Sequence, residues 1–358
     1  MAHSILITGV SGYIGGSILA AILDWKSKED VQLNISALVR SESQASVIDG
    51  LGVQSILVKD FDELEKLEKL GEEFDIIIHA GAGWHTASAK AFIRGLSVRR
   101  AAGKNAHYIQ ISGTSNLSDR PHSANFIETR TFSDEEDIYS YEKSRETDEV
   151  YYQRTTDINV VETGEALLVP TSIVMAPTIF GLGTGPLNKW SVQLPAIIAN
   201  ALERRQVKVL SEGQTVWTHV HIEDLTDLFV LLARKILGDE NIPSGRKGIY
   251  FCETGEHTHL EIAQRLADAG ADLGLFSSAD VKSVRLQEAA DAFAGGNMFR
   301  AELSFGANAR SKAVLARKMG WKPSREGEWV GTFATELKKY VRNGPTPKAL
   351  PRVMRNHE

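Results

Sequence analysis

The stretch IYSYEKSRE at residues 138–146 brings two tyrosines and a lysine together in a polar segment. Tyr139 precedes Lys143 by four residues, so on a helix the two side chains share one face, one turn apart. An ammonium group at that distance would stabilise a phenolate and lower the tyrosine pKa from its ordinary value near 10, which favours proton transfer. The competing interpretation is an exposed helix face, because in a chain with eight tyrosines such a match arises by chance about half the time.

The first 180 residues alternate short apolar runs with helical stretches, and these elements would have to position the pair. The runs are SILITG (4–9), LNISALVR (33–40), QSILVKD (54–60), DIIIHAGAG (75–83) and HYIQISGTS (107–115), and residues 166–181 carry a sixth. The continuous isoleucine run of the fourth is typical of a strand that is buried on both faces. Strands separated by helices predict an α/β fold with a doubly wound parallel sheet of the Rossmann type over 1–180.

The regular alternation ends at GLGTGP, residues 181–186, which indicates a hinge or loop. We expect residues 181–358 to form mainly a smaller substrate-binding domain. The segments near 214–228 and 248–253 are expected to return to the Rossmann core.

Charge and composition argue against several classes of partner. A formal net charge of −6 argues against nucleic acid and anionic membranes, and no stretch approaches the ~20 apolar residues of a membrane span. The single cysteine, Cys252, allows no disulfide within the chain, so we expect a reducing, cytoplasmic location. His219 and His221 have no accompanying ligand cluster, so no metal is expected.

Three glycines follow the first predicted strand. Gly9, Gly12 and Gly15 stand three apart in TGVSGYIGG and open a helix. A tight turn needs the first, a pyrophosphate approaches the bare backbone of the second, and the third lets the helix pack on the strand. The pattern also occurs in plain structural turns, but here its strand-to-helix context favours dinucleotide binding.

The second predicted strand ends at Arg40, where a dinucleotide fold meets the adenosine ribose. A carboxylate there would bind the 2′-hydroxyl, whereas an arginine would pair with a 2′-phosphate. Ser41 and Ser43 add hydroxyl donors, and Glu42 complicates the interpretation. The residues therefore favour NADP over NAD, unless Arg40 is simply a solvated residue at a strand end.

On these motifs the chain resembles the extended branch of the short-chain dehydrogenase/reductase superfamily, which includes NAD(P)-dependent epimerases and dehydratases. TGVSGYIGG is similar to the T-G-x-x-G-x-x-G opening of that branch, and VKDF (58–61) and DIIIHAGAG (75–83) are similar to its third- and fourth-strand segments. APTIFG (176–181) resembles the segment that passes the nicotinamide. The residues expected to contact the cofactor are Gly9, Ser11, Gly12, Tyr13, Ile14, Gly15, Arg40, Asp60, Phe61, Ala80, Gly81, Ala82, Tyr139, Lys143, Pro177, Thr178 and Ile179.

The resemblance also implies a catalytic set. The family carries a Ser/Thr after the fifth strand and a Tyr-x-x-x-Lys on the following helix. Thr114 falls at the first position, twenty-five residues before Tyr139, with Ser112 and Ser115 as close alternatives. Tyr139 would then exchange the proton, Lys143 would hold the nicotinamide ribose, and Thr114 would orient the substrate oxygen.

Two further residues, Trp84 and His85, follow the fourth strand directly. They are expected either to line the substrate cleft or to begin the next helix. Asp60 and Thr114 likewise have alternative roles as caps of local turns.

The leading functional hypothesis is an NADPH-dependent oxidoreductase that reduces a carbonyl of a small organic molecule, with Tyr139 as proton donor. A nucleotide-sugar epimerase or dehydratase with bound NAD is the second hypothesis, and a non-catalytic dinucleotide-sensing regulator is the third. By resemblance, a homodimer through the helices near 86–103 and 137–155 is expected.

Overall fold

A computed structural model describes residues 2–124 and 126–345. Its centre is a sheet of seven parallel strands in the order β11-β7-β5-β4-β1-β2-β3. The strands are β1 (His3–Thr8), β2 (Leu33–Val39), β3 (Gln54–Leu57), β4 (Ile76–His79), β5 (His107–Gly113), β7 (Thr171–Ala176) and β11 (Ile249–Phe251). The predicted doubly wound Rossmann sheet is confirmed.

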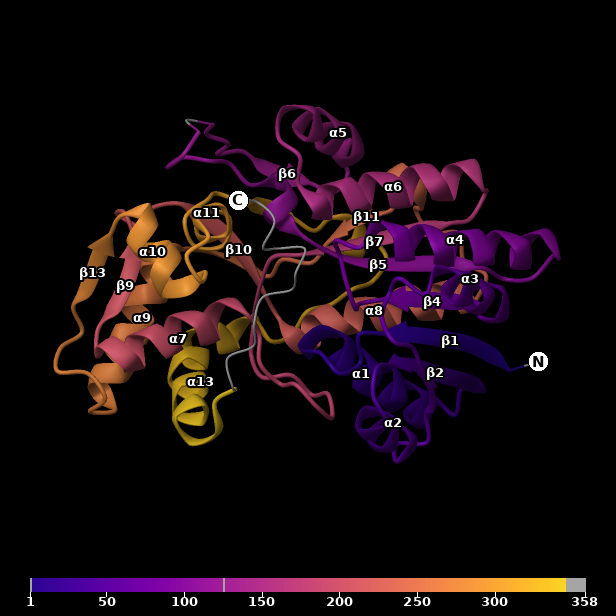
Figure 1. Ribbon diagram of the computed structural model, residues 1–358, viewed down its shortest axis with the longest axis horizontal. Coiled ribbons are helices and arrows are strands. Elements are labelled where there is room, and N and C mark those ends of the chain that lie inside the picture. Colours follow the sequence, from indigo (N-terminus) through magenta and orange to yellow (C-terminus); the bar gives the residue numbers. More distant parts are fainter. Residues whose placement is uncertain (1, 125, 346–358) are drawn as a thin grey trace.

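Helices cover both faces of this sheet (Figure 1). One face carries α1 (Tyr13–Glu29) packed against α8 (Ile222–Leu237), with α2 (Glu42–Asp49) nearby. The other face carries α3 (Leu64–Glu73), α4 (Thr86–Ala101) and α6 (Tyr152–Ala166), which pack in that order.

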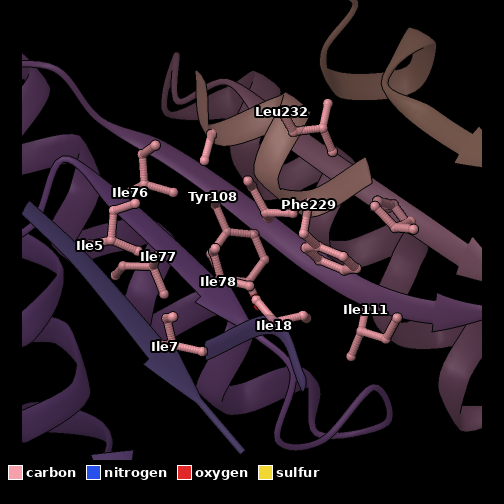
Figure 2. Packing of buried hydrophobic residues seen from close by; sticks show 14 of the residues in the cluster. Ile5, Ile7, Ile18, Ile76, Ile77, Ile78, Tyr108, Ile111, Phe229 and Leu232 are labelled. Carbon is pink, nitrogen blue, oxygen red and sulfur yellow. The ribbon is translucent and has the colours of Figure 1, made fainter. Parts of the chain in front are cut away.

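The core between sheet and helices joins distant parts of the chain. Figure 2 shows Phe229 and Leu232 of α8 in one cluster with the isoleucines of β1 and β4, Tyr108 of β5 and Ile18 of α1. Phe229 and Leu232 are fully buried, and burial of side chains of this size contributes roughly 1.5–3 kcal/mol each. The segment 222–237 and the strand β11, which pairs with β7, therefore belong to the Rossmann core although they lie in the second half of the sequence.

The connection between β5 and α6 is long and has structure of its own. After the short 3₁₀ turn Thr114–Leu117, the chain forms β6 (Thr131–Ser133) and α5 (Ile138–Asp148) before α6 begins. Helix α5 lies on the outside of α6 (Figure 1). The helix that packs on α4 after the fifth strand is thus α6, and not the helix that carries Tyr139.

The C-terminal part has a second hydrophobic cluster of its own, built on the parallel pair β9–β13. Its elements are α7 (Gln193–Arg204), β9 (Val207–Leu210), α9 (His259–Asp272), β13 (Val281–Val284), α10 (Leu286–Phe293), α11 (Met298–Phe305) and α13 (Trp329–Asn343). The short helix α12 (Leu315–Lys318) packs instead on β11 of the Rossmann core. Two small sheets connect it to the Rossmann part: β10 (Val216–His221) between β8 (Thr178–Phe180) and β12 (Gly255–Thr258), and β14 (Arg310–Lys312) on β6.

Within the described ranges, no helix has both the length and the apolar character needed to cross a membrane.

Candidate active site

The glycine turn after β1 is built for close backbone approach. Gly9 has φ +74°, and a Cβ there would lie 2.6 Å from the carbonyl oxygen of Ala80. A Cβ on Gly15 would overlap the carbonyl oxygen of Gly9. Any larger residue at these two positions would push the turn away from β4, so the glycines serve the geometry that the sequence predicts.

The first turn of α1 offers backbone N–H groups to an anion. Its N-cap, Gly12, supplies no side-chain cap, and no acidic residue stands in the first turn. The N–H groups of a helix start that lack such partners, together with the helix dipole, favour a phosphate group. The turn therefore fits the pyrophosphate of a dinucleotide.

A cleft opens from this turn across the carboxyl ends of β1, β2 and β4. Its lining residues are Gly9, Ser11, Gly12, Leu38, Val39, Arg40, Gln44, Val58, Asp60, Phe61, Ala80 and Gly81. Eight of these twelve were predicted from the sequence. The sequence analysis did not predict the other four, which are Leu38, Val39, Gln44 and Val58. They lie close in sequence to Arg40 and Asp60 at the strand ends, and this position could have indicated them.

The remaining residues predicted from the glycine segment and the fourth strand are not part of the lining of this cleft. The Tyr13 hydroxyl donates to the carbonyl oxygen of Gly181 at 2.6 Å, so it ties α1 to the end of β8. Ile14 packs against the core, and Gly15 and Ala82 are buried. These residues shape the cleft from below.

Arg40 lines one end of the cleft, just after β2. Its side chain is exposed and makes no ion pair within residues 2–124 and 126–345, while its backbone N–H donates to Gln44 at 3.0 Å. Ser41 caps α2, and its hydroxyl lies 3.0 Å from that of Ser43. Glu42 is exposed and does not line the cleft, so no carboxylate from the end of β2 does so.

A buried polar contact supports the same edge of the sheet. The His79 ring lies 2.8 Å from the Thr8 hydroxyl and 3.1 Å from that of Ser88. Burial lowers the pKa of His79 to about 3, so the ring is neutral at ordinary pH. The Phe61 ring meets it edge-on with centroids 5.0 Å apart, which fixes the wall of the cleft.

The Tyr139–Lys143 pair lies away from this cleft. Both groups bind Glu162 of α6: the Tyr139 hydroxyl at 2.9 Å and the Lys143 ammonium at 2.8 Å. Glu162 stands near the C-terminal end of α6, about 15 Å along the helix from Tyr152. Arg246, which precedes β11, lies over the Tyr139 ring at 5.0 Å, so the pair is near the amino ends of β7 and β11.

The electrostatics at Tyr139 also differ from the expectation. Burial and the hydrogen bond to Glu162 raise the pKa of Tyr139, and the opposing effect of Lys143 is smaller. The structure therefore corrects the assignment of this pair: its ammonium is paired with a carboxylate, and its phenol does not reach the carboxyl edge of the sheet.

Thr114 is also engaged elsewhere. Its side chain is fully buried, and its hydroxyl accepts a hydrogen bond of 2.7 Å from the Trp217 indole. Ser112 is hydrogen-bonded to the buried Asp157. Of the three hydroxyl residues that the sequence left open, only Ser115 is partly exposed.

Ser115 belongs to a compact group of three polar side chains at the end of β5. Its hydroxyl lies 3.2 Å from the Tyr151 hydroxyl and donates to Gln153 Oε1 at 2.9 Å. The Tyr151 hydroxyl also lies 3.2 Å from that oxygen. Tyr151 caps α6 and Gln153 is in its first turn, so the helix that packs on α4 supplies a tyrosine to the site. No sequence spacing marked Tyr151, because no lysine stands four residues later.

A model of the NAD dependent epimerase/dehydratase family matches residues 5–242. The chain belongs to this family. The predicted resemblance to extended short-chain dehydrogenases/reductases is thereby confirmed. The prediction of an oxidoreductase-type enzyme that uses a nicotinamide dinucleotide is confirmed as well.

The similar proteins differ widely from this chain in sequence. The Oxidase ucsJ of Acremonium sp is 28% identical over 343 residues, which cover 90% of this chain and 93% of that protein. The dTDP-glucose 4,6-dehydratase DesIV of Streptomyces venezuelae, solved with NAD and TYD bound, has a TM-score of 0.63 at 15% identity, over 95% of this chain and 97% of that one. A UDP-glucuronic acid 4-epimerase of Bacillus cereus, in complex with UDP-glucuronic acid and NAD, has a TM-score of 0.58 at 13% identity, over 94% and 99%.

Two further sets of predicted residues follow the ends of β4 and β7. Trp84 is partly buried just after β4, and His85 caps α4 by accepting from the Ser88 N–H at 3.2 Å. Pro177 and Thr178 are buried where β8 begins its pairing with β10, and Ile179 is partly exposed. These residues lie outside the lining of the cleft at Arg40, and their contact with a cofactor stays a prediction.

Proposed function

We propose that this family member is an NADP(H)-preferring oxidoreductase that reduces a carbonyl of a small organic molecule, with Tyr151 as the proton donor. When bound, the dinucleotide supplies the hydride. The chain supplies the cradle at Gly9 and Gly12, selection of the 2′-phosphate at Arg40, and a proton at the Tyr151 hydroxyl.

The proposed cofactor preference rests on one observation, which is that the Arg40 side chain has no ion-pair partner among the described residues. Its guanidinium lines the cleft, makes no ion pair within the described ranges, and faces no carboxylate from the end of β2. Arginine binds phosphate oxygens bidentately, whereas a 2′-hydroxyl is normally bound by a carboxylate. The similar solved structures contain NAD, so both cofactors are compared in the experiment that tests this preference.

The proton donor is supported by the contacts of Tyr151. Burial raises the pKa of Tyr151, although its hydrogen bond with Ser115 and the cations of Arg120 and Arg154 oppose the effect. A phenol with a raised pKa keeps its proton at neutral pH and can give it to an oxygen on which negative charge develops. The Ser115 hydroxyl, which donates to Gln153 Oε1 in the structure, would have to turn its O–H to the same oxygen to act as a second donor. These properties suit reduction better than alcohol oxidation.

A fluorescence titration of the purified protein with NADPH and NADH tests the proposal. We expect NADPH to bind at least tenfold more tightly, which is about 1.4 kcal/mol. Equal affinities would show that Arg40 does not select the cofactor. No binding of either would show that the cradle is not a working site.

The second candidate is a nucleotide-sugar epimerase or dehydratase that keeps NAD bound. It is favoured by the similar structures, which include a dTDP-glucose 4,6-dehydratase and a UDP-glucuronic acid 4-epimerase. Release of the bound nucleotide from purified, denatured protein distinguishes the two: stoichiometric NAD supports this second candidate, and an empty site that fills reversibly with NADPH supports the first.

A further inference from the structure

Gln153 Oε1 is a common acceptor for the Ser115 and Tyr151 hydroxyls. It accepts from Ser115 at 2.9 Å and from Tyr151 at 3.2 Å, and the two hydroxyl oxygens lie 3.2 Å apart. Among the residues that the structure describes, Ser115 and Gln153 are the only side chains hydrogen-bonded to the Tyr151 hydroxyl. An amide oxygen has two lone pairs, so it can accept from both hydroxyls at once. Gln153 therefore sets the direction of both O–H bonds.

The ends of two strands leave the space that the Gln153 amide fills. A Cβ on Gly113, the last residue of β5, would lie 3.3 Å from Gln153 Oε1. A Cβ on Gly83, which follows β4, would lie 3.2 Å from Gln153 Nε2. Strands β4 and β5 are neighbours in the sheet, so the amide lies at the carboxyl ends of two adjacent strands. In open α/β sheets this is the edge at which ligands bind.

An amide acts on the Tyr151 phenol differently from the lysine of the Tyr-x-x-x-Lys pattern. An ammonium one helical turn after the tyrosine would stabilise the phenolate. Thr155 stands at that position after Tyr151, and its hydroxyl is hydrogen-bonded to Glu146. The oxygen of Gln153 accepts from the neutral phenol instead, and so favours its protonated form. A group that gives a proton to a carbonyl oxygen has to be protonated before the reaction.

We propose that Gln153 is a positioning residue, whose amide oxygen orients the Ser115 and Tyr151 hydroxyls and keeps the phenol protonated until a substrate carbonyl oxygen replaces it as acceptor. In the reaction the O–H bond of Tyr151 breaks and an O–H bond forms on the substrate oxygen, with the hydride supplied by the dinucleotide. The phenolate that remains then takes a proton from water. The role in turnover rests on the proposed function, whereas the contact of Gln153 with the phenol does not.

A fluorine probe at position 151 tests this contact without turnover. The full-length protein carries 3,5-difluorotyrosine, whose phenol ionises near neutral pH, in place of Tyr151, and fluorine NMR follows its titration. We expect Gln153→Ala to lower the pKa of this phenol by about one pH unit, because the neutral form loses its acceptor. Gln153→Glu should raise that pKa by about one pH unit or more, because a carboxylate opposes a phenolate. Gln264→Ala, at an exposed position of α9, is the matched control and should leave the pKa unchanged.

The opposite signs of the two expected shifts separate positioning from a merely structural role, because loosening of the first turn of α6 would move the pKa in one direction in both variants. An unchanged pKa in both variants would overturn the inference. A raised pKa in Gln153→Ala would also overturn it, since that result would place the amide N–H, and not Oε1, against the phenol.

Steady-state kinetics gives a second readout, with the aldehyde or ketone of a screened panel that supports the fastest NADPH oxidation. We expect Gln153→Ala to lower kcat about tenfold with KM unchanged, and Gln153→Glu to recover part of the loss. A wild-type kcat in Gln153→Ala would overturn the positioning role. If the fluorine shifts appear as expected but no carbonyl compound is reduced, the proposed function fails and the contact between Gln153 and Tyr151 stands.

Discussion

The Trp217 indole nitrogen donates a hydrogen bond of 2.7 Å to the Thr114 hydroxyl, across 103 positions of the chain. This bond fastens strand β10 to the turn that follows β5. It also uses the hydroxyl that the family pattern would assign to the substrate.

Replacement of Thr114 by Val should therefore reduce the stability of the fold and leave kcat unchanged. The change leaves the buried indole N–H without an acceptor, which costs about 1–3 kcal/mol. We expect a lower midpoint in chemical denaturation and an unchanged kcat for the protein that remains folded. Thr114→Ser keeps the acceptor and should lie near the wild type in both measurements. A large loss of kcat in a stably folded Thr114→Val would return Thr114 to the catalytic set.

We expect opposite effects on turnover when Tyr151 and Tyr139 are each replaced by phenylalanine. Tyr151→Phe removes the proposed proton donor and should lower kcat about 10²- to 10⁴-fold with little change in NADPH affinity. Tyr139→Phe removes a hydrogen bond to Glu162, far from the cleft, and should keep turnover while losing roughly 1 kcal/mol of stability.

Steady-state kinetics of both variants, with a NADPH titration of each, checks this pair. The reverse pattern, an inactive Tyr139→Phe and an active Tyr151→Phe, would restore the pair expected from sequence spacing. It would also require α5 to move relative to α6.

Arg40 should control the choice of cofactor. Arg40→Ala removes the guanidinium from the adenosine end of the cleft, so we expect NADPH affinity to fall about ten- to hundredfold and NADH affinity to stay the same. Arg205→Ala, an exposed arginine after α7, controls for a general loss of positive charge. An equal fall for both cofactors would contradict selection of the 2′-phosphate.

Glu336 should make stability depend on pH. Its carboxyl is almost fully buried and accepts from the Gly181 N–H at 2.9 Å and from Thr332 at 3.0 Å. Its second oxygen has no partner among the residues that the structure describes. Burial raises the pKa of Glu336 to about 7. Between the ordinary value near 4.5 and about 7, the folded state binds more protons than the unfolded state, so stability falls as pH rises through this window.

Glu336→Gln should flatten that fall, because glutamine keeps the acceptor oxygen and has no charge. Urea denaturation from pH 4.5 to 8 should show a relative gain for the variant of roughly 2–3 kcal/mol at pH 8. Glu256→Gln, an exposed carboxyl, should leave the slope as in the wild type. An unchanged slope in Glu336→Gln would show that this carboxyl is ionised at neutral pH.

The features that the sequence alone determined depend on residues close together in the chain. The alternation of apolar runs with helices predicted the sheet, and the spacing of Gly9, Gly12 and Gly15 predicted the cradle, because backbone geometry and strand burial depend on neighbouring residues. The prediction that Arg40 lines the cleft likewise depended only on its position at the end of one strand, β2. These features are set by a few consecutive positions, so the one-dimensional pattern carries them.

The tertiary structure decided which side chains reach the reacting edge of the sheet. Spacing along the chain gave Tyr139 and Lys143 a family-like position, but the excursion through β6 placed their helix outside α6. It also brought Trp217 onto Thr114 and α11 onto Tyr151. The physical reason is that packing of surfaces from distant segments chooses the helix that covers the sheet, and no motif of four residues contains that information.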